Sequence, residues 1–493
     1  MTNKGKLTGI LIIFLILNSC SIRNYEKPEP AAAKETTFEL NRSEKFEAAK
    51  PVADWWSNFN DSDLDTLIYD ALRYNYDVEI AVANIRRTKA LLREAGFNLY
   101  PTGDVQAGYT FTVQSASNGL PIIDRGVEIY DFSVDVNWQI DLFGRVSQAK
   151  EAAKSVYQAT IAELNGIYVS VAAEVAATYI QLRGTQQRLE VARQNEEVQE
   201  STFNLTRQLV NSGMSSELDS LRAKAQLEFT RSAIPPLKAQ IQSAMNRLSV
   251  LTGTAPGRLD DWLDESAGLP SIPESVALGN AEEMIRRRPD VNQAERELSA
   301  AVAEFNVAAT DFFPKIDFFG SVGYSAANIK DLGSSDALVG IVGPTISWSI
   351  LDFGRVKARA DAADAETERT LAAFNRTVIE ALEEISNSMS DFGREEERRK
   401  RLVEAASLSA RTAELARERY QAGLTSFLDA LEAESTLLEA QDQVVLSNMA
   451  VANDLISIYT SLGGGWQVMS ESETPEEMAE ADEERLESIN NEK

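Results

Sequence analysis

The sequence contains no histidine and a single cysteine among its 493 residues. Histidine is the commonest general base near neutral pH and the commonest metal ligand, so its absence removes the usual basis for acid–base catalysis and for a metal centre. A single cysteine excludes an intrachain disulfide. We therefore expect no catalytic residues, no metal site and no bound cofactor.

Basic residues are few relative to acidic ones. The chain has 48 lysines and arginines against 76 aspartates and glutamates, which gives a formal net charge of −28. Proteins that bind nucleic acid present a basic surface, so this balance argues against a nucleic-acid partner. Adjacent carboxylates such as Glu383 and Glu384 occur, but charge runs on a long helix usually form a solvated face. An enzyme acting on the cell envelope is therefore a weak alternative.

Near the N-terminus, residues 7–17 form an apolar run that follows two lysines. The run is too short for a membrane-spanning helix and is typical of a secretory signal peptide, here residues 1–19. It leads into Leu-Asn-Ser-Cys, which resembles the lipobox of bacterial lipoproteins and predicts a covalent lipid on Cys20. Ser21 at the next position favours export to the outer membrane. A plain secretory signal with an incidental thiol is the alternative.

The two ends of the mature chain carry little apolar patterning. Residues 20–50 are rich in Pro, Ala, Glu and Lys, which predicts a lipid anchor followed by a tether to the folded body. Residues 467–493 are strongly acidic and cannot bury enough apolar surface to become ordered. We expect this C-terminal segment to be a solvated, disordered tail.

The body of the chain repeats itself at an offset of 210 residues. Two Phe-Gly-Arg motifs, each preceded by a tryptophan, carry the repeat: Phe143, Gly144 and Arg145 return as Phe353, Gly354 and Arg355. Later in each half, Gly213 returns as Gly423. The repeat divides the body into a first half (51–252), a linker rich in Gly and Pro (253–280) and a second half (281–466).

Each half contains two segments in which apolar and polar residues alternate. They are residues 104–114 and 129–141 in the first half, and 315–324 and 338–350 in the second. Alternation with period two predicts two-faced strands, and their length is enough to cross a bilayer at the tilt of a barrel. The pattern is weaker in the second half, where two glycines and Pro344 interrupt it. A water-facing sheet packed on a core is the alternative.

Four strands cannot close a barrel, and an open edge in lipid would leave backbone N–H and C=O groups unpaired. The smallest outer-membrane barrels have about eight strands. We therefore expect other copies of the chain to complete the barrel. Three copies would give twelve strands and a polar lumen, although two copies would also satisfy closure.

The remainder of each half is predicted to be a long hairpin of helices. The segments 146–210 and 355–421 show apolar residues at helical spacing, with many alanines, and returning helices follow at 218–251 and 427–462. Gly213 and Gly423 suit the helix ends. A rod of this length would measure on the order of 100 Å.

Three arginines before Pro289 also mark the start of a helix in the second half. Pro289 suits the first helical turn, and Asp290 suits the positive end of the helix dipole. We interpret the arginines as a solvated or ion-paired start of this helix, with an anion-binding site as the alternative.

Several motifs in fixed order resemble one family, the TolC-like outer-membrane efflux factors, and within it the lipoprotein branch called NodT-type. The resemblance covers residues 55–466. It is carried by the paired Phe-Gly-Arg-Val turns and by these residues: Trp55, Trp56, Tyr100, Pro101, Arg287, Arg288, Pro289, Asp290, Val291, Phe313, Pro314, Leu462, Gly463, Gly464, Gly465 and Trp466.

The resemblance implies an α+β membrane protein without enzymatic activity. A homotrimer would form a twelve-stranded barrel, four strands from each chain, continuing into a periplasmic tunnel of coiled-coil helices. The protein would be the outer-membrane duct of a tripartite efflux system with a periplasmic adaptor and an inner-membrane pump of the RND type. A duct for type I protein secretion and a structural periplasmic coiled-coil lipoprotein are alternatives. The cargo stays open among drugs, metal ions and polypeptides.

The resemblance also places a gate at the periplasmic hairpin ends. Its positions fall on Leu428, Asp429 and Glu432, and the first-half counterparts are Leu218, Asp219 and Arg222. Asp429 and Glu432 are three residues apart and share a helix face, so threefold symmetry would stack two acidic rings. Acidic rings favour cations. We expect Arg222 to pair with a carboxylate at the hairpin end and to hold the closed state; an exposed, unpaired arginine is the alternative.

Overall fold

The computed structural model describes residues 23–29, 46–47, 53–113, 115, 126–273, 275–277 and 281–472. The signal peptide, Cys20 and residues 473–493 lie outside the described residues. The chain divides into two compact units, in the following ranges: unit 1 is Met1–Glu29, Ile85–Thr160 and Gln293–Phe374, and unit 2 is Pro30–Asn84, Ile161–Asn292 and Asn375–Lys493. No helix in these described ranges is long and apolar enough to cross a membrane.

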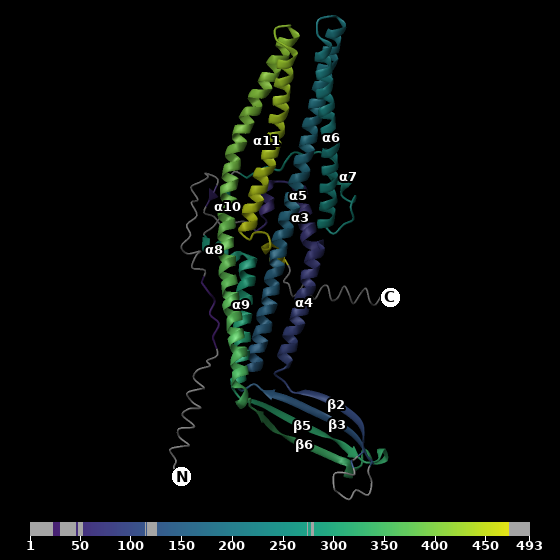
Figure 1. The fold of residues 1–493 in the computed structure, drawn as a ribbon, viewed down its shortest axis with the longest axis vertical. Helices are drawn as coiled ribbons and strands as arrows, with labels where there is room; N and C mark the ends of the chain where they lie inside the picture. Colours follow the sequence, from purple (N-terminus) through teal and green to yellow (C-terminus); the bar gives the residue numbers. More distant parts are fainter. Residues whose placement is uncertain are drawn as a thin grey trace. The chain divides into compact units, whose positions relative to one another are not determined.

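Unit 1 contains an antiparallel sheet built from both halves of the sequence. Its strands follow the order β2 (Thr102–Val113), β3 (Gly126–Ile140), β5 (Lys315–Ala326) and β6 (Leu338–Ser347). Figure 1 shows the four strands as one layer. All four predicted strands are present, with ends that differ by no more than three residues from the expected ones. Pairing of β3 with β5 joins the two repeats in one sheet.

The register of the sheet gathers apolar residues on one face. Val105 pairs with Val134, and Val134 pairs in turn with Val322. Polar residues fill the other face, where Ser325 Oγ donates to Asp131 Oδ1 at 2.7 Å. The apolar residues are largely exposed, Val105 at 68%. A water-facing sheet would bury this face against a core, so the exposure disfavours that alternative.

Gly323 and Pro344 interrupt the apolar–polar alternation of the second half, and the structure gives a reason for each. A Cβ atom on Gly323 would overlap the backbone of Phe132 in the neighbouring strand, so glycine permits the close approach of β3 and β5. Pro344 lies in β6, an edge strand, where a missing N–H is tolerated.

The helices of unit 1 are segments of α4 (Tyr76–Phe97), α5 (Arg145–Asn211), α9 (Pro289–Ala309) and α10 (Phe353–Gln421). Asp141 caps the start of α5 by accepting the backbone N–H of Val146 at 2.8 Å. Ser155 of α5 and Ser299 of α9 share a buried hydrogen bond of 3.0 Å. These helices extend from unit 1 into unit 2 as continuous elements.

The two Phe-Gly-Arg motifs connect strands to helices in different ways. Gly144 adopts a positive φ of 78° before α5, whereas Gly354 already lies within α10. Phe143 stacks on Phe313 with ring centroids 4.9 Å apart. Arg145 forms an ion pair with Asp311. The motifs therefore mark the turns between the sheet and the long helices.

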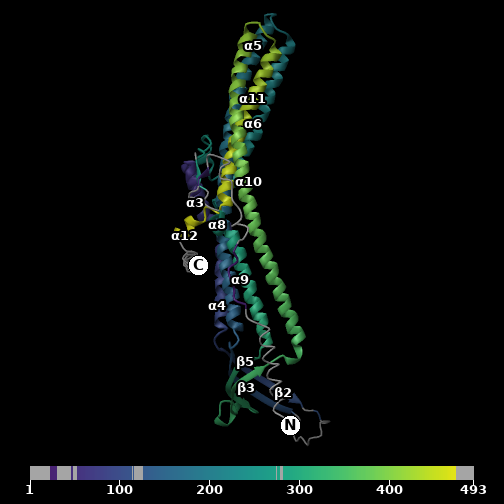
Figure 2. The same ribbon diagram turned by 90° about the vertical axis from the view of Figure 1, so that its left-hand side faces the viewer.

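Unit 2 adds the returning helices α6 (Glu217–Leu251) and α11 (Phe427–Ser461), together with α3 (Ser62–Tyr74). Figure 2 shows the two hairpins, α5–α6 and α10–α11, running side by side. Smaller elements complete the unit: a 3-10 helix (Trp55–Phe59), α7 (Asp260–Leu263), α8 (Ala281–Arg287), α12 (Gln467–Ser472), and a two-residue pairing of β1 (Phe46–Glu47) with β4 (Val276–Ala277).

Aromatic stacking and a buried arginine hold the core of unit 2. Trp55 stacks on Tyr459 at 5.2 Å between ring centroids. Arg288 is 8% exposed, pairs with Asp290 and Glu384, and donates to the Ser461 carbonyl at 2.7 Å. The arginine run thus supplies an ion-paired helix start, and Arg288 is already occupied by these partners rather than open to an anion.

The structure describes parts of the predicted tether and of the predicted tail. In the predicted tether, Arg23 contacts Asn306 and Asp364, and Phe46 packs on Phe392 with ring centroids 6.0 Å apart. In the predicted tail, residues 467–472 form α12, and Gln467 bonds the backbone of Gly463 and Gly465. The expectation of a disordered tail was wrong for residues 467–472, whereas the role of residues 20–50 as a tether stays a prediction.

Gly184 lies where α5 crosses α11, and a Cβ atom there would overlap Met449. We expect Gly184→Ala to lower the free energy of unfolding by about 1–3 kcal/mol through overpacking. Gly166 is a matched control in the same helix, because a Cβ there makes an ordinary contact. Gly166→Ala should leave the thermal midpoint equal or higher. Equal midpoints for both variants would contradict this packing.

Candidate gate in the helical hairpins

Each hairpin turns at a glycine in the left-handed conformation. Gly213 has φ +73° and Gly423 has φ +68°. The N–H of Gly213 bonds the carbonyl of Val210 at 2.9 Å, and the following N–H reaches the carbonyl of Leu209 at 2.8 Å. The same pair of bonds recurs at Gly423. This pattern is a Schellman motif, which explains why both turns need glycine.

The returning helices begin with matched serine caps. Ser426 caps α11, and Asp429 accepts hydrogen bonds from the Thr425 hydroxyl at 2.6 Å and the Ser426 hydroxyl at 2.8 Å. Asp219 accepts an equivalent bond from Ser216 at 2.8 Å. The bonds from Thr425 and Ser426 lower the pKa of Asp429. The carboxylate therefore stays ionised and is held in one position.

The gate residues predicted from the sequence lie at the start of the returning helices. Leu428 is 51% exposed, and Asp429 and Glu432 are exposed beside it. In the first hairpin, Leu218 is 54% exposed. Arg222 Nη1 lies 3.9 Å from Asp219 Oδ1, one turn earlier in the same helix. The expected partner of Arg222 is thus a neighbour in α6, and its effect on a closed state stays a prediction.

Arg231, which could not be singled out from local sequence motifs, links α6 to α5 through ion pairs. Arg231 Nε lies 2.8 Å from Glu196 Oε1, and Nη2 lies 3.3 Å from Glu200 Oε2. A third carboxylate, Glu228, is 3.4 Å away within α6. The counterpart of Arg231 in the second half is Gln441. A comparison of the repeats at the 210-residue offset could have found this difference.

The ion pairs of Arg231 lie next to two prolines that interrupt the backbone hydrogen bonds of α6. Pro235 and Pro236 are inside α6. Proline has no N–H, so the carbonyls of Arg231 and Ser232 lose their helical donors. The second-half counterparts of the prolines are valine and leucine. The first hairpin therefore combines a local weakening of its backbone with an ionic contact across its two helices.

A buried carboxylate joins the first hairpin to the second. Glu434 of α11 is 6% exposed and accepts hydrogen bonds from Arg417 Nε at 3.0 Å and Thr202 Oγ1 at 3.3 Å. Further along the same helices, Arg188 Nε lies 2.7 Å from Asp442 Oδ1. These contacts connect α5, α10 and α11. A movement of one hairpin relative to the other would therefore have to break them.

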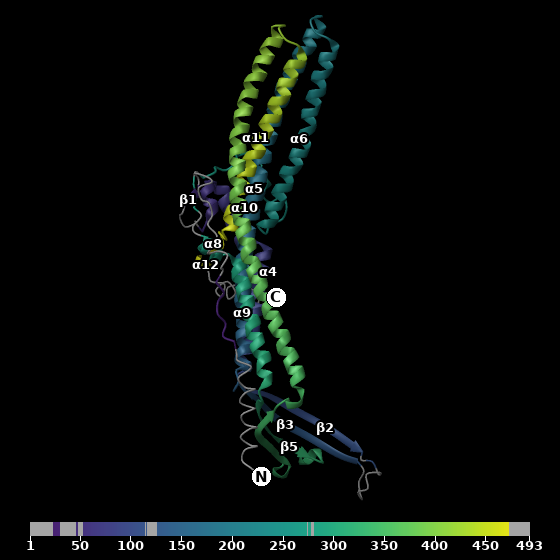
Figure 3. The same cartoon turned by 60° about the vertical axis from the view of Figure 1, so that its left-hand side comes forward.

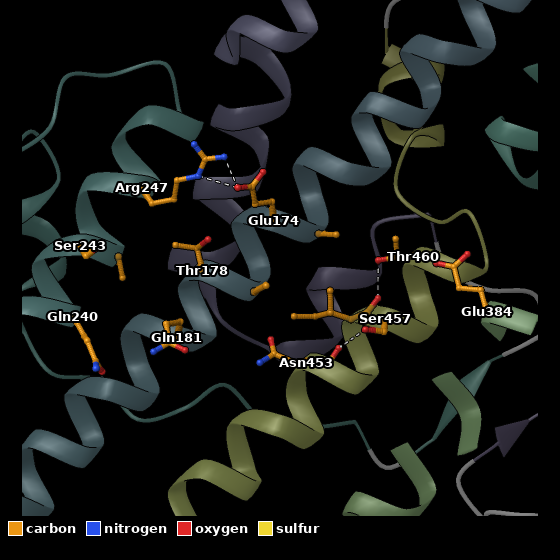
Figure 4. Close-up of a pocket in the computed structure, with 14 residues that line it drawn as sticks. Glu174, Thr178, Gln181, Gln240, Ser243, Arg247, Glu384, Asn453, Ser457 and Thr460 are labelled. Atoms are coloured by element: carbon orange, nitrogen blue, oxygen red, sulfur yellow. Dashed lines mark hydrogen bonds and ion pairs between the residues drawn. The ribbon is translucent and has the colours of Figure 1, made fainter. Parts of the chain in front are cut away.

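Figure 4 shows a cavity of about 760 Å³ in unit 2 between α5, α6 and α11. Arg247 Nε donates to Glu174 Oε1 at 2.8 Å, so the charges of this pair compensate each other. The Ser457 and Thr460 hydroxyls donate to carbonyls of their own helix. The two carboxylates of the lining, Glu174 and Glu384, form ion pairs with Arg247 and Arg288.

A second groove, of about 440 Å³, is acidic. Its lining includes the pair Glu383 and Glu384 together with Asp391 and Asp454. Burial, with the charges of Asp391 and Glu395, raises the pKa of Asp454 to about 6. Across the part of the chain that the structure describes, no cluster of three or more acidic or cysteine side chains is placed to hold a metal ion.

The sequence model of one family, described as "Outer membrane efflux protein", matches residues 67–254 and again residues 280–464. The two matches cover more than half of the chain. This chain belongs to the outer membrane efflux protein family. Because one model matches twice, the internal duplication is confirmed.

Relatives of this efflux protein cover almost its whole length. "Nodulation protein T" of Rhizobium leguminosarum bv. viciae is 25% identical over 459 residues, 92% of each chain. "Outer membrane protein OprJ" of Pseudomonas aeruginosa is 30% identical over 478 residues, 92% of this chain and 95% of OprJ. The solved structure of the outer-membrane channel OprN superposes with a TM-score of 0.85 at 34% identity and covers 91% of this chain and all of that one.

These similarities confirm the TolC-like outer-membrane channel fold and the resemblance to the NodT-type branch. The protein is an outer-membrane efflux channel. Its family consists of channels rather than enzymes.

The exposed acids of the second hairpin should set the ion selectivity of the efflux channel. We expect Asp429→Asn with Glu432→Gln to reduce cation preference, seen as a shift of the reversal potential toward zero in a salt gradient across a planar bilayer. The amides keep most of the capping geometry. Glu414→Gln, in an exposed pair with Arg411 of α10, is the matched control. An unaltered reversal potential in the double variant would contradict this assignment.

The raised pKa of Asp454 makes a pH-dependent contribution to stability. Its folded pKa exceeds the unfolded value, so the stability is present below about pH 4 and is lost as pH rises through 6. We expect Asp454→Asn to raise the free energy of unfolding at pH 7.5 by about 1 kcal/mol, after solvent screening, with no change at pH 4.

Thermal unfolding followed by circular dichroism at both pH values would check this contribution. Glu404→Gln, an exposed residue of α10 paired with Arg401, provides the control and should show no pH-dependent difference. A stabilisation by Asp454→Asn that is equal at pH 4 and pH 7.5 would be inconsistent with titration of this group.

Proposed function

We propose that three copies of this chain form one channel whose barrel has twelve strands, four from each copy. The observation that carries the proposal is the sheet of unit 1. Among the described strands, β2 and β6 form its two edges, and one sheet face exposes apolar side chains. Lipid can cover that face, but it cannot pair the backbone groups of the edges. Pairing β6 of one copy with β2 of the next would provide hydrogen-bond partners for the backbone groups of both edge strands.

A trimer fits a duct better than a dimer does. Eight strands enclose an interior just wide enough for side chains, whereas twelve leave room for a lumen. Asp135, Asn137 and Gln139 lie on the polar face of β3 and would line that lumen. The polar lining and the exposed apolar face together support a water-filled passage through the outer membrane.

The hairpins would continue the passage into the periplasm as a tunnel. In a trimer, Leu428, Asp429 and Glu432 would form rings at the ends of the second hairpins, with Leu218, Asp219 and Arg222 beside them. All of these residues except the half-buried Asp219 are exposed in the single chain, which supports this role. The capping bonds of Asp429 would keep its ring in place.

The channel would need partners that supply energy and cargo. We propose that a periplasmic adaptor and an inner-membrane pump of the RND type drive transport, with this chain as a passive duct. The match to the outer membrane efflux protein family supports such an assembly. We also propose that a lipid on Cys20 anchors the chain in the outer membrane, as the Leu-Asn-Ser-Cys sequence predicts.

Native mass spectrometry of the detergent-extracted protein, combined with planar-bilayer recording, tests the proposal. We expect three chains in each particle, a lipid-sized mass increment on the peptide that begins at Cys20, and a stable ion conductance. Particles with two chains, or three-chain particles without conductance, would contradict it.

A further inference from the structure

The face of the sheet that carries the polar residues also has an apolar part, on β5 and β6. Residues that pair directly across an antiparallel ladder point to the same face of a sheet. Asp135 of β3 pairs with Ser321 of β5, and Ser321 pairs in turn with Ile341 of β6. Ile341 therefore lies on the face of the aspartate and the serine, and not on the apolar face that lipid would cover.

Two more apolar residues accompany Ile341. Side chains of a strand return to one face at every second position, so Val339 shares the face of Ile341, and Phe319 shares the face of Ser321. Val339 and Ile341 are 49% and 63% exposed, and Phe319 is half-buried. We call Phe319, Val339 and Ile341 the apolar strip. In the proposed channel the strip would face the water-filled lumen, where exposed apolar surface is unfavourable.

The first two strands carry acids on the same face. Asp104 of β2 pairs directly with Asp135 of β3, and Asp131 lies four positions before Asp135 on that face. Like charges directly opposite each other destabilise a sheet. Within the four described strands the only basic residue is Lys315, and it forms an ion pair with Asp311. The strands themselves therefore supply no cation for the aspartates of this face.

The acids and the apolar strip are close enough for one small molecule to contact both. Neighbouring strands lie about 4.8 Å apart, so the backbones at Asp135 and Ile341, two strands apart, are separated by roughly 10 Å. Phe319 lies on the strand between them, at roughly 8 Å from Asp135 by the same spacing. Figure 1 shows the four strands in this order, and Figure 3 shows β2, β3 and β5 of the same layer from another side.

In the proposed trimer, acidic and apolar parts would alternate around the lumen. Pairing of β6 with β2 of the next copy would place the acids of that copy on the other side of each apolar strip. An organic cation could then rest its apolar body on the strip and bring its charge close to a carboxylate. A small hydrated cation would gain nothing from the strip, and an anion would be repelled by the acids.

We propose that the apolar strip, together with Asp104 and Asp135, binds organic cations that carry an apolar body as they pass through the barrel. The inference rests on the proposed function, because the strip faces a lumen only if several copies close the barrel. It adds a chemical class of cargo to that function. The uncompensated negative charge beside the strip selects a cationic occupant over a neutral or an anionic one.

Block of the single-channel current in planar bilayers tests the proposal on the full, detergent-extracted channel. Three probes separate the contributions of charge and apolar surface. Tetraphenylphosphonium combines a positive charge with four rings, tetramethylammonium has the same charge with little apolar surface, and naphthalenesulfonate combines two rings with a negative charge. A bilayer without channels corrects for any probe that crosses the lipid. The measured quantity is the probe concentration that halves the open-channel current.

The strip variant, Val339→Thr with Ile341→Thr, replaces apolar groups by hydroxyls and keeps β-branched side chains that suit a strand. The matched control is Val127→Thr. Val127 lies on the same face of β3 as Asp135, eight positions earlier, which is roughly 27 Å along the strand. A third variant, Asp135→Asn, removes one charge beside the strip and keeps the size of the side chain.

We expect tetraphenylphosphonium to block the wild type at a roughly tenfold lower concentration than tetramethylammonium, and naphthalenesulfonate not to block it. The strip variant should need roughly fivefold more tetraphenylphosphonium, with unchanged block by tetramethylammonium and an unchanged open-channel current. The Val127→Thr control should match the wild type. Asp135→Asn should weaken the block by both cations, because both interact with the charge.

Equal blocking concentrations of the two cations in the wild type, or a conducting strip variant that matches the wild type, would overturn the inference and leave the channel function intact. Block by naphthalenesulfonate as strong as that by tetraphenylphosphonium would also overturn it. If the strip variant forms no conducting channels, the comparison of the three probes on the wild type decides. A wild type that does not conduct at all would instead contradict the proposed function.

Discussion

The constraint on which the architecture depends is the pairing of backbone N–H and C=O groups at the edges of one four-stranded sheet. A sheet whose apolar face is exposed can enter lipid only if its edge strands, β2 and β6, find partners. One chain does not supply them, which is why we propose that three copies complete the barrel. The register places Val105, Val134 and Val322 on one face across three strands. In the proposed trimer, assembly and membrane insertion would both depend on this alternation.

The helical hairpins face a different constraint, because long helices with many alanines bury little surface and need polar contacts to fix their register. Buried or half-buried ion pairs provide these contacts: Arg231 within the first hairpin, and Glu434 with Arg417 between the hairpins. Pairs of this kind help to determine which helices pack together. Removing one partner is destabilising, because the other charge is left without compensation. They are suited to a wall whose helices keep one fixed register.

Patterns that depend on neighbouring residues could be predicted from the sequence. The alternation of the strands, the glycines at the hairpin turns and the 210-residue repeat each follow from local geometry, and the structure shows them within a few residues. Contacts between distant segments could not. Glu432 and Glu434 are two residues apart, yet only Glu434 is buried, because α5 and α10 pack on that side. The composition of residues 20–50 predicted a tether, but it gave no sign of the hydrogen bond between Arg23 and Asn306, 283 positions away.

Disulfide scanning between the two edge strands tests the central claim most directly. Single cysteines at Tyr109 in β2 are combined with cysteines at successive positions of β6, and the chain without introduced cysteines controls for Cys20. The account predicts cross-links between different chains at the β6 position that lies opposite Tyr109, none at the adjacent positions on the other face, and a covalent product of three chains. Cross-links confined to one chain, products of only two chains, or no dependence on the face would contradict it.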